Sequence, residues 1–501
     1  MTQDSIRSVL PLVTSAVQAF LPAVLSSLTD EAILRLNAAE QLVGQLLDAL
    51  RGALWEGIQA FWKQRAELAA GACATCGRPC ERAERAVRVT VSEQTLLVNR
   101  VYFYCRSCRR GNAPLAQWLG LHHGQGSAQF ERHLVALSAQ KSFHQAAAQM
   151  IEQHGQVVNA GKAERVTYAV ARDALVYLAE RHTQAGDVFH GANLPVGVDT
   201  LLVTTDGGGA PVGVLQRPPR DAGQDPTQPP QKTTPKRHLL QGKRQQTHRE
   251  MRVVIAHALP HEHGEPRCLD VHVAPLDQPD VSGDRMLATA RLAGMGTSTH
   301  IHGVFDGGTW IKPQFLRVFG DSPHSICLDR PHVIEYLSDA AKALFPDESQ
   351  QEDQRVWLND TKEHLQAGTW STVVQNLRFS EAKDVVAART YVENHHEDML
   401  YSRYEAEGLP IGSGEAEGAI RHQVRARFDN AGVWREEHLS PMGALLSIRQ
   451  SGWWEDFWMW RESRDVEAFR ARQRGEHKRK FRGHAQPTAS GASSSVEGQA
   501  K

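Results

Sequence analysis

The amino-acid sequence predicts a multidomain α+β protein, and three observations support this class. Apolar residues recur at helical spacing in residues 1–68, two closely spaced cysteine pairs bracket two strand-like runs, and strand-like runs alternate with a helix from residue 191 onward. A chain of 501 residues is long enough for about three domains, each with its own core.

Charge and cysteine usage restrict the class of protein. The chain carries 56 Lys and Arg against 57 Asp and Glu, so any surface that binds nucleic acid or an anionic membrane must be local. Five of the seven cysteines lie between residues 73 and 108, which does not look like a secreted disulfide framework and indicates a reducing cytoplasm. The uncharged stretch 9–27 contains Pro11 and Pro22, so we expect no membrane span.

Residues 1–68 are expected to form a helical leader. Apolar residues such as Ile33, Leu36, Leu46 and Leu50 recur at helical spacing there. We expect this leader to serve in packing or in oligomerisation.

Two cysteine pairs flank a predicted β-hairpin in residues 69–128. The runs Ala86–Val91 and Leu96–Tyr104 are rich in β-branched and aromatic residues, which favour strands. Four thiolates at this spacing suit one tetrahedral Zn²⁺ and predict a zinc ribbon, in which four protein ligands make the metal structural. The expected ligands are Cys73, Cys76, Cys105 and Cys108. Cysteines without metal are the alternative, and Cys80 could replace one ligand.

Residues 129–190 have the outline of a helix-turn-helix. Ser142 is placed to cap a helix, His154 and Gly155 can make the turn, and Ala160–Leu178 reads as a longer amphipathic helix. On that helix, four residues that recur every three or four positions form a possible DNA-binding face: Lys162, Arg165, Tyr168 and Arg172. The alternative is the solvated side of an ordinary helical hairpin.

Residues 191–335 read as the first part of an α/β domain. The run Pro195–Thr205 is β-rich and is expected to end at Asp206. Residues 217–249 hold eight Lys or Arg and two acidic residues and are expected to form a mobile basic loop that could follow a phosphate backbone. Further strands are expected at Met251–Leu259, Cys268–Ala274, His300–Phe305 and Ser325–Leu328, and a helix at Asp284–Leu292.

The rest of the chain divides into three parts. Residues 336–405 are mainly helical, and residues 406–470 begin with a turn-rich stretch, continue into a helix with Glu415 and Glu417, and close with a Trp-rich region. Residues 471–501 are basic and then rich in Ser, Gly and Ala, so we expect a disordered tail.

Three carboxylates follow expected strands or turns, each beside glycines. They are Asp206, Asp306 and Glu417. Strand ends present side chains into a common crevice, and hard carboxylate ligands suit Mg²⁺ or Mn²⁺, which can serve phosphodiester displacement. Taken singly, each acid also suits a turn or a helix cap.

An ordered set of motifs runs through residues 70–460. It comprises the two CxxC pairs, the helix-turn-helix outline, Asp206-Gly, Phe305-Asp306-Gly-Gly-Thr-Trp-Ile311, Leu328-Asp329-Arg-Pro-His332 and Pro410-Ile-Gly-Ser-Gly-Glu-Ala-Glu417, with Arg425, Gly432-Val-Trp434, Ala444–Arg449 and Trp453–Trp458 beyond. This set resembles the bacterial DDE transposases, and among them the Kra group of insertion sequences.

The resemblance implies an RNase-H-like catalytic domain with a helical insertion before the last acid. It implies that Asp206, Asp306 and Glu417 are the catalytic metal ligands, and that Asp329 and His332 lie near the site, without a role assigned. His332 also reads as a helix-start histidine satisfied by a neighbour. The implied activity is cleavage and strand transfer of double-stranded DNA at terminal inverted repeats, by a homodimer or larger assembly in the bacterial cytoplasm at the nucleoid.

The sequence leaves alternatives open at two of the acids. Asp199 lies seven residues before Asp206 and is expected nearer the middle of the strand, while Phe305 stands where the family often has Gly before the second acid. Glu415 competes with Glu417, but the two side chains point about 200° apart on a helix, so both cannot easily reach one metal pair.

Two arginines follow the last acid at helical spacing. Arg421 and Arg425 lie one and two turns beyond Glu417 and either hold phosphates or make surface ion pairs. The functional alternatives to a transposase are a non-catalytic DNA-binding regulator, an inactive remnant, and a metal-dependent nuclease without strand transfer.

Overall fold

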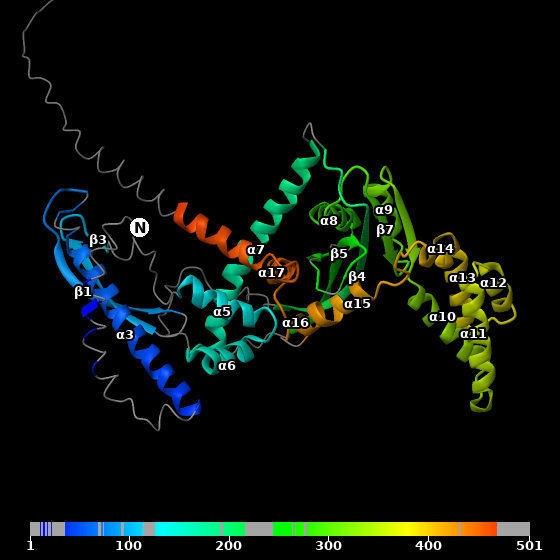
Figure 1. Cartoon of the computed structure of the whole chain (residues 1–501), viewed down its shortest axis with the longest axis horizontal. Coiled ribbons are helices and arrows are strands. Elements are labelled where there is room, and N and C mark those ends of the chain that lie inside the picture. Colours follow the sequence, from blue (N-terminus) through cyan, green and yellow to red (C-terminus); the bar gives the residue numbers. More distant parts are fainter. Residues whose placement is uncertain are drawn as a thin grey trace, which may run out of the picture. The chain divides into compact units, whose positions relative to one another are not determined.

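The computed structural model is mixed α+β (Figure 1). It describes residues 36–68, 72–73, 75–91, 95–113, 126–190, 194–215, 244–262, 264–265, 267–274, 278–429 and 432–467, and the isolated positions 11, 14, 15, 18 and 22. Residues 217–243 of the expected basic loop, the expected tail at 471–501 and nearly all of residues 1–35 lie outside the described residues.

The chain forms two compact units. The first comprises Met1–Glu131, His154–Gln156 and Glu462–Lys501, and the second comprises Arg132–Gln153 and Val157–Arg461. Helices of the expected helix-turn-helix region thus belong largely to the second unit rather than to a unit of their own.

The first unit consists of one long helix and a three-stranded antiparallel sheet. Its elements are α3 (Leu36–Leu68), β1 (Glu81–Thr90), β2 (Thr95–Cys105) and β3 (Arg110–Asn112), in the strand order β1-β2-β3. Trp55 and Trp62 of α3 pack against buried residues of the hairpin, among them Val87, Val98 and Val101. The expected hairpin therefore forms, with strands somewhat longer than the sequence runs indicated.

A five-stranded mixed sheet is the centre of the second unit. Its strands are β4 (Thr200–Leu215), β5 (Arg244–Leu259), β6 (Cys268–Val273), β7 (His300–Phe305) and β8 (His324–Leu328), in the order β6-β5-β4-β7-β8. The β6-β5-β4 pairs are antiparallel, whereas β4, β7 and β8 run parallel. Helix η1 (Val188–His190) precedes the sheet.

Helices cover both faces of this sheet. On the first face, α17 (Leu439–Gln450) packs on β6 and α7 (Ala160–Asp187) packs on α17, while α5 (Ala128–Ser138) and α6 (Phe143–His154) add residues to the same core. The second face carries α8 (Pro279–Leu292) and α9 (Ile311–Phe319). Successive side chains of β5 point to opposite faces of the sheet and so enter the cores on both sides. Val253 and Ile255 belong to the core on the first face, and Val254 and Ala256 belong to the core on the second.

A block of helices follows β8 and has a core of its own. It contains α10 (Arg330–Leu344), α11 (Gln351–Gln366), α12 (Trp370–Leu377), α13 (Lys383–His395) and α14 (Tyr401–Ala406), with the short turns η2 (Glu348–Gln350) and η3 (His396–Asp398). Its core includes Val304 and Leu328 from the sheet, so the block is anchored at the parallel edge. The expected helical segment is therefore present, and it already begins at Arg330.

The chain then returns to the sheet. It forms α15 (Gly414–Ala419), the π-helical turn η4 (Ile420–Arg425), α16 (Ala426–Phe428) and η6 (Glu436–His438) before α17, and residues 454–467 form a last helical segment. Trp453, Trp454, Trp458 and Trp460 join the core that α7 and α17 build, as the Trp-rich sequence suggested.

Two expectations about β4 and its neighbour are wrong. Strand β4 does not end before Asp206 but continues through Gly207–Gly209 to Leu215. Residues 244–249 belong to β5 and not to a loop, since Ala210 pairs with Arg249 across the ladder. Polar side chains do not prevent pairing here, because the ladder is made by backbone groups.

Tyr168 is a core residue rather than part of an exposed basic face. It is 9% exposed, and its ring stacks on His438 with the ring centroids 3.6 Å apart. Burial follows from its place in the apolar stripe of α7, next to Ala171. Arg165 and Arg172 are exposed, and Lys162 is partly exposed.

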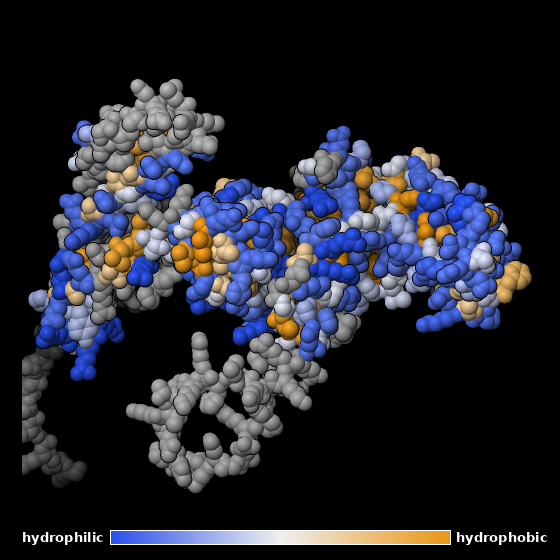
Figure 2. Space-filling view, turned by 90° about the horizontal axis from the view of Figure 1, so that it is seen from below, coloured by the Kyte–Doolittle hydropathy of each residue, from blue (hydrophilic) through white to orange (hydrophobic). Residues whose placement is uncertain are grey.

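The view in Figure 2 shows a mostly hydrophilic surface, with apolar residues gathered in small separate groups. Among the described helices, none combines the length and the apolar character that a bilayer crossing requires.

Candidate functional site

The four cysteines named from the sequence converge on one point. The sulfur atoms of Cys73, Cys76, Cys105 and Cys108 all lie within 4.8 Å of one another. The Sγ atoms of Cys76 and Cys105 are 3.6 Å apart, close to the roughly 3.8 Å expected between ligands of a tetrahedral Zn²⁺. The cluster can therefore hold a structural metal and is compatible with Zn²⁺, whereas Cys80 lies outside the group.

Both cysteine pairs are shaped as tight turns. Gly77 and Arg109, each directly after the second cysteine of its pair, have positive φ angles of 70° and 54°. The backbone N–H of Thr75 donates to Sγ of Cys73 and lowers the pKa of that thiol to about 6. A hydrogen bond with Cys76, together with burial, instead raises the pKa of Cys108 to about 12, because both favour the protonated thiol. A bound dication would favour the thiolate form.

Two of the three named carboxylates come from neighbouring parallel strands. Asp206 lies within β4, and Asp306 directly follows the last residue of β7. Since Thr204 pairs with Val304, both acids lie at the same level of the sheet. Each carboxylate accepts a backbone N–H, from Gly207 at 2.6 Å and from Gly308 at 3.0 Å respectively.

Asp206 lies between two grooves. The first, which we call the aromatic groove, has a volume of about 460 Å³ and is lined by Asp206, Gly207, Gly208, Gly209, His248, Arg249, Glu250, Asp306, Gly308, Trp310 and Ile311. The second, the arginine groove, has a volume of about 320 Å³ and is lined by Asp206, Gly414, Glu417, Gly418, Ile420, Arg421, His422 and Arg425. The sheet and α15 therefore bring all three named acids around one point.

The carboxylates interact electrostatically. Burial raises the pKa of Asp206, the charges of Asp306 and Glu417 raise it further, and Arg425 opposes them. Their oxygens are more widely spaced than the thiols, since the four cysteines are the one set of potential ligands in the described chain that converges within 4.8 Å. This donor set suits a hard divalent cation, which would relieve the mutual repulsion.

The structure separates Glu415 from Glu417. Glu415 accepts from Nε2 of His257 at 3.2 Å and from Arg267 at 3.5 Å, whereas Glu417 lines the arginine groove beside Asp206. The two side chains point in different directions because they lie two positions apart on a helix. Asp199, the other alternative, is exposed and lies directly ahead of β4, not in the middle of the strand, so the full length from Thr200 to Asp206 separates it from the site.

The pair of His257 and Glu415 should make stability depend on pH. Burial opposes the charged form of His257, but the hydrogen bonds to Glu415 and to the Ala258 carbonyl raise its pKa above 6.5. Its contribution to the free energy of unfolding is therefore complete below pH 6.5 and is lost as the pH rises through the raised pKa. The hydrogen bond from His257 lowers the pKa of Glu415 below 4.5, so its contribution is present above pH 4.5 and is lost as pH falls through the lowered pKa.

We therefore expect Glu415→Gln to destabilise the protein most between pH 4.5 and 6.5. The effect should be about 1 kcal/mol or less, because 37% of the Glu415 side chain is exposed and solvent screens the pair. Urea unfolding of both proteins across this pH range measures the difference. A destabilisation that is the same at pH 5.5 and at pH 9 would exclude the ion pair as its source.

Asp329 holds the segment that leads to Glu417. Its carboxylate is buried and accepts from the Ser413 hydroxyl at 2.8 Å and from the Ser413 N–H at 3.3 Å. Its own N–H donates to the Phe305 carbonyl, and the N–H of Arg330 donates to Ile411. Asp329 therefore fastens the turn before α15 to the ends of β7 and β8, and it acts as a positioning residue.

Replacing Asp329 by alanine should lower the free energy of unfolding by about 2 to 3 kcal/mol, because it leaves buried donors of Ser413 without an acceptor. Asp339→Ala is the matched control, since Asp339 is an exposed aspartate on α10 whose carboxylate forms a surface ion pair with Lys342. Denaturant unfolding measures both variants, and equal stabilities would contradict the role of Asp329.

The remaining named residues lie around the site in different ways. Nδ1 of His332 is 3.4 Å from Glu335, and its ring contacts Tyr336 and Tyr391, which agrees with a histidine satisfied at a helix start. Arg421 and Arg425 are exposed and line the arginine groove from the π-helical turn η4. A π turn shifts the helical register and is often found at functional sites.

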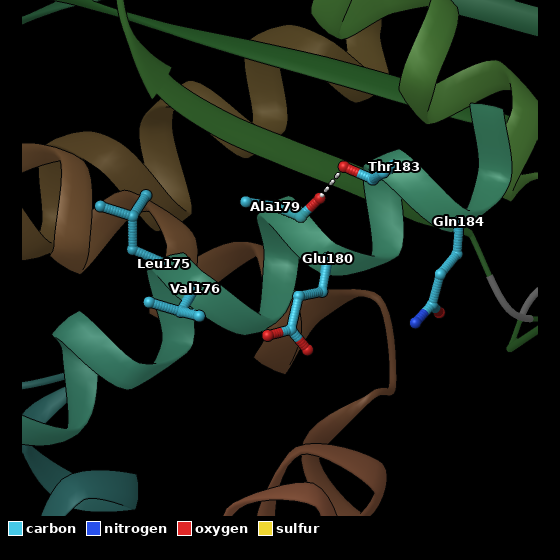
Figure 3. A pocket seen from close by; sticks show the side chains of 6 residues that line it. All are labelled: Leu175, Val176, Ala179, Glu180, Thr183 and Gln184. Carbon is cyan, nitrogen blue, oxygen red and sulfur yellow. Dashed lines mark hydrogen bonds between the residues drawn. The ribbon is translucent and has the colours of Figure 1, made fainter. Parts of the chain in front are cut away.

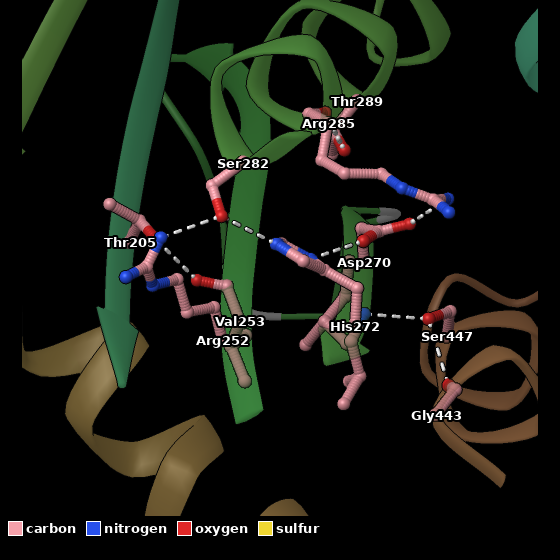
Figure 4. A network of polar contacts seen from close by, with 12 residues as sticks. Thr205, Arg252, Val253, Asp270, His272, Ser282, Arg285, Thr289, Gly443 and Ser447 are labelled. Atoms are coloured by element: carbon pink, nitrogen blue, oxygen red, sulfur yellow. Dashed lines mark hydrogen bonds and ion pairs between the residues drawn. The ribbon is translucent and has the colours of Figure 1, made fainter. Parts of the chain in front are cut away.

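Sequence reasoning missed a polar network behind the aromatic groove (Figure 4). Arg252 donates to Ser282 at 2.9 Å, Ser282 contacts His272 at 2.9 Å, and His272 contacts Asp270 at 2.8 Å. Arg252 also donates to Glu250 at 2.9 Å. The order Asp, His, Ser is that of a hydrolase triad, but Ser282 is fully buried and accepts from Arg252, so the network is structural. Its members come from separate elements, and no local motif marks them.

A further groove lies along the exposed side of α7 (Figure 3). It has a volume of about 510 Å³ and is lined by Leu175, Val176, Ala179, Glu180, Thr183 and Gln184. Thr183 donates to the carbonyl of Ala179 and is thereby satisfied within the helix. Glu180 is the one titratable residue in its lining. This groove is therefore a weaker candidate for a catalytic or metal site than the carboxylates around Asp206, although its volume is larger.

No protein-family model matches the chain, and no curated protein matches it. The assignments above therefore depend on the geometry of the site alone.

Proposed function

We propose that this protein is a DDE-type DNA transposase similar to the Kra group of insertion sequences. It would bind terminal inverted repeats and catalyse metal-dependent cleavage and strand transfer. One observation carries the proposal: Asp206, Asp306 and Glu417, from two parallel strands and from the helix after a helical block, surround one point beside two arginines.

The sheet supports an RNase-H-like catalytic fold. Three antiparallel strands, β6, β5 and β4, are followed across the sheet by the parallel strands β7 and β8. The first acid lies on the central strand β4, the second at the end of its parallel neighbour, and the third on the helix that follows the block α10 to α14.

Asp206, Asp306 and Glu417 would hold Mg²⁺ or Mn²⁺. Such ions, when bound, supply the Lewis acid that stabilises the attacking and leaving oxygens of a phosphodiester displacement. Arg421 and Arg425 bind phosphate oxygens along the arginine groove by charge-assisted hydrogen bonds. Asp329 keeps Glu417 at the site by fixing the turn before α15.

Both units would take part in recognising DNA ends. The cysteine cluster and the three-stranded sheet of the first unit support a zinc ribbon with structural Zn²⁺. In the second unit, α6 and α7 support a helix-turn-helix whose exposed Arg165 and Arg172 would contact the phosphate backbone. Two DNA ends require two active sites, so we propose a homodimer or a larger assembly at the nucleoid.

Labelled DNA that carries the ends of the element, incubated with Mg²⁺ or Mn²⁺ and a target plasmid, tests the proposal. We expect nicks that release a 3′-hydroxyl at the ends and joined products in the plasmid. Nicks without joined products would favour a nuclease that lacks strand transfer. Binding without nicks under either metal would favour a DNA-binding regulator or an inactive remnant.

A further inference from the structure

The side chain of Trp310 forms one wall of the aromatic groove beside Asp206 and Asp306. Trp310 occupies the position directly before α9, four residues after Asp306. The guanidinium of Arg252 lies over its ring, 3.7 Å from the centroid. Arg252 is only 5% exposed, so it covers the ring from the protein interior. Trp310 itself is half-buried: it packs against the core under α8 and α9 and also lines the groove.

A chain of hydrogen bonds holds the guanidinium behind this ring. Arg252 donates to Glu250 and to Ser282, and the chain continues from Ser282 through His272 to Asp270. Figure 4 shows the part from Arg252 to Asp270. The Arg285 charge and the His272 hydrogen bond overcome the effect of burial and hold the pKa of Asp270 well below its usual range, so the network is anchored by a buried carboxylate. A ring with fixed orientation loses little entropy when a ligand stacks on it.

Charge separates the two grooves that meet at Asp206. The aromatic groove carries the carboxylates of Asp206, Asp306 and Glu250, and its Arg249 is paired with Glu436 at 2.8 Å. The arginine groove shares Asp206 and adds Glu417, but it also carries the two cationic side chains of Arg421 and Arg425. Phosphates of a DNA strand are therefore favoured in the arginine groove, whereas the wall of the aromatic groove suits a flat, uncharged group.

We propose that Trp310 stacks on an unpaired nucleobase of the DNA strand whose phosphate lies at Asp206 and Asp306. This inference rests on the proposed function for the identity of the ligand as DNA. Stacking of bases on aromatic side chains is tolerant of sequence, because every base has a flat face. Trp310 thus holds the end of the strand open at the site, while the arginine groove holds its backbone.

The test compares two short single-stranded DNA probes that bind the full-length protein in the presence of Ca²⁺, an oligothymidylate and an abasic strand of equal length. The native protein should bind the oligothymidylate about tenfold more tightly. Trp310→Ala should remove most of this preference, and Trp310→Phe should keep most of it. Phe379→Ala is the matched control, since Phe379 is an aromatic residue that is 89% exposed on the helical block.

Each outcome decides for or against the stacking site. The stacking site is overturned if the native protein and Trp310→Ala prefer the oligothymidylate over the abasic strand equally. It is also overturned if Trp310→Phe loses this preference as Trp310→Ala does. Arg425→Ala should weaken both probes equally, and free thymidine monophosphate should not compete, which distinguishes a strand from a mononucleotide. A preference for bases that depends on Trp310, found without cleavage of DNA ends, would support the stacking site and refute the transposase. Cleavage of DNA ends without this preference would support the transposase and refute the stacking site.

Discussion

Replacing Asp306 by alanine should lower the rate of metal-dependent cleavage of DNA ends by about a thousandfold or more. In the proposed site, the substitution removes a cation ligand at the end of β7 and leaves Asp206 and Glu417 to hold the cation that would stabilise the displacement. DNA binding should persist, since Asp306 opposes rather than attracts phosphates in the absence of metal. A gel assay of nicked end DNA, with binding measured separately, separates the two effects.

Two matched controls accompany this variant. Asp199→Ala removes the same side chain from the residue directly ahead of β4, about 23 Å from Asp206 for seven extended residues, and should cleave at the native rate. Glu417→Gln should be as inactive as Asp306→Ala, whereas Glu415→Gln should retain cleavage because Glu415 pairs with His257. Native cleavage by Asp306→Ala, or loss of cleavage in Asp199→Ala, would contradict the assignment.

Replacing Cys105 by serine should lower the affinity for zinc by several orders of magnitude. Cys105 is buried, and its sulfur lies 3.6 Å from that of Cys76, so no water can replace it without disturbing the cluster. Since metal binding and folding are coupled in such small sheets, residues 72–113 should become sensitive to proteases. Metal analysis of the purified protein and limited proteolysis measure the two effects.

Cys80→Ser is the control for this variant. Cys80 lies close enough for the charges of Cys73 and Cys105 to raise its pKa together with burial, yet it stands outside the group of four. We expect Cys80→Ser to keep one zinc. Retention of zinc by Cys105→Ser together with its loss from Cys80→Ser would instead make Cys80 a ligand.

Strand and helix positions were predictable where local pattern decides them. The strand His300–Phe305 has the bounds that the sequence indicated, and the hairpin between the cysteine pairs forms as expected. The extent of β4 was not predictable in the same way. Asp206 and the three glycines after it read as a turn, but each of them pairs with a residue of β5, so they remain in the sheet.

The amino-acid sequence by itself determined the cysteine cluster, the order of the elements and the candidate acids Asp206 and Asp306, because CxxC spacing and strand patterns are local properties. Only the tertiary structure shows that Glu415 pairs with His257 whereas Glu417 lines the arginine groove. It also places Tyr168 in the core and gives Asp329 and Trp310 their partners. Their partners are distant in sequence: His257 lies 158 residues from Glu415, and Ser413 lies 84 residues from Asp329. The direction and burial of a side chain depend on such partners, which no local pattern contains.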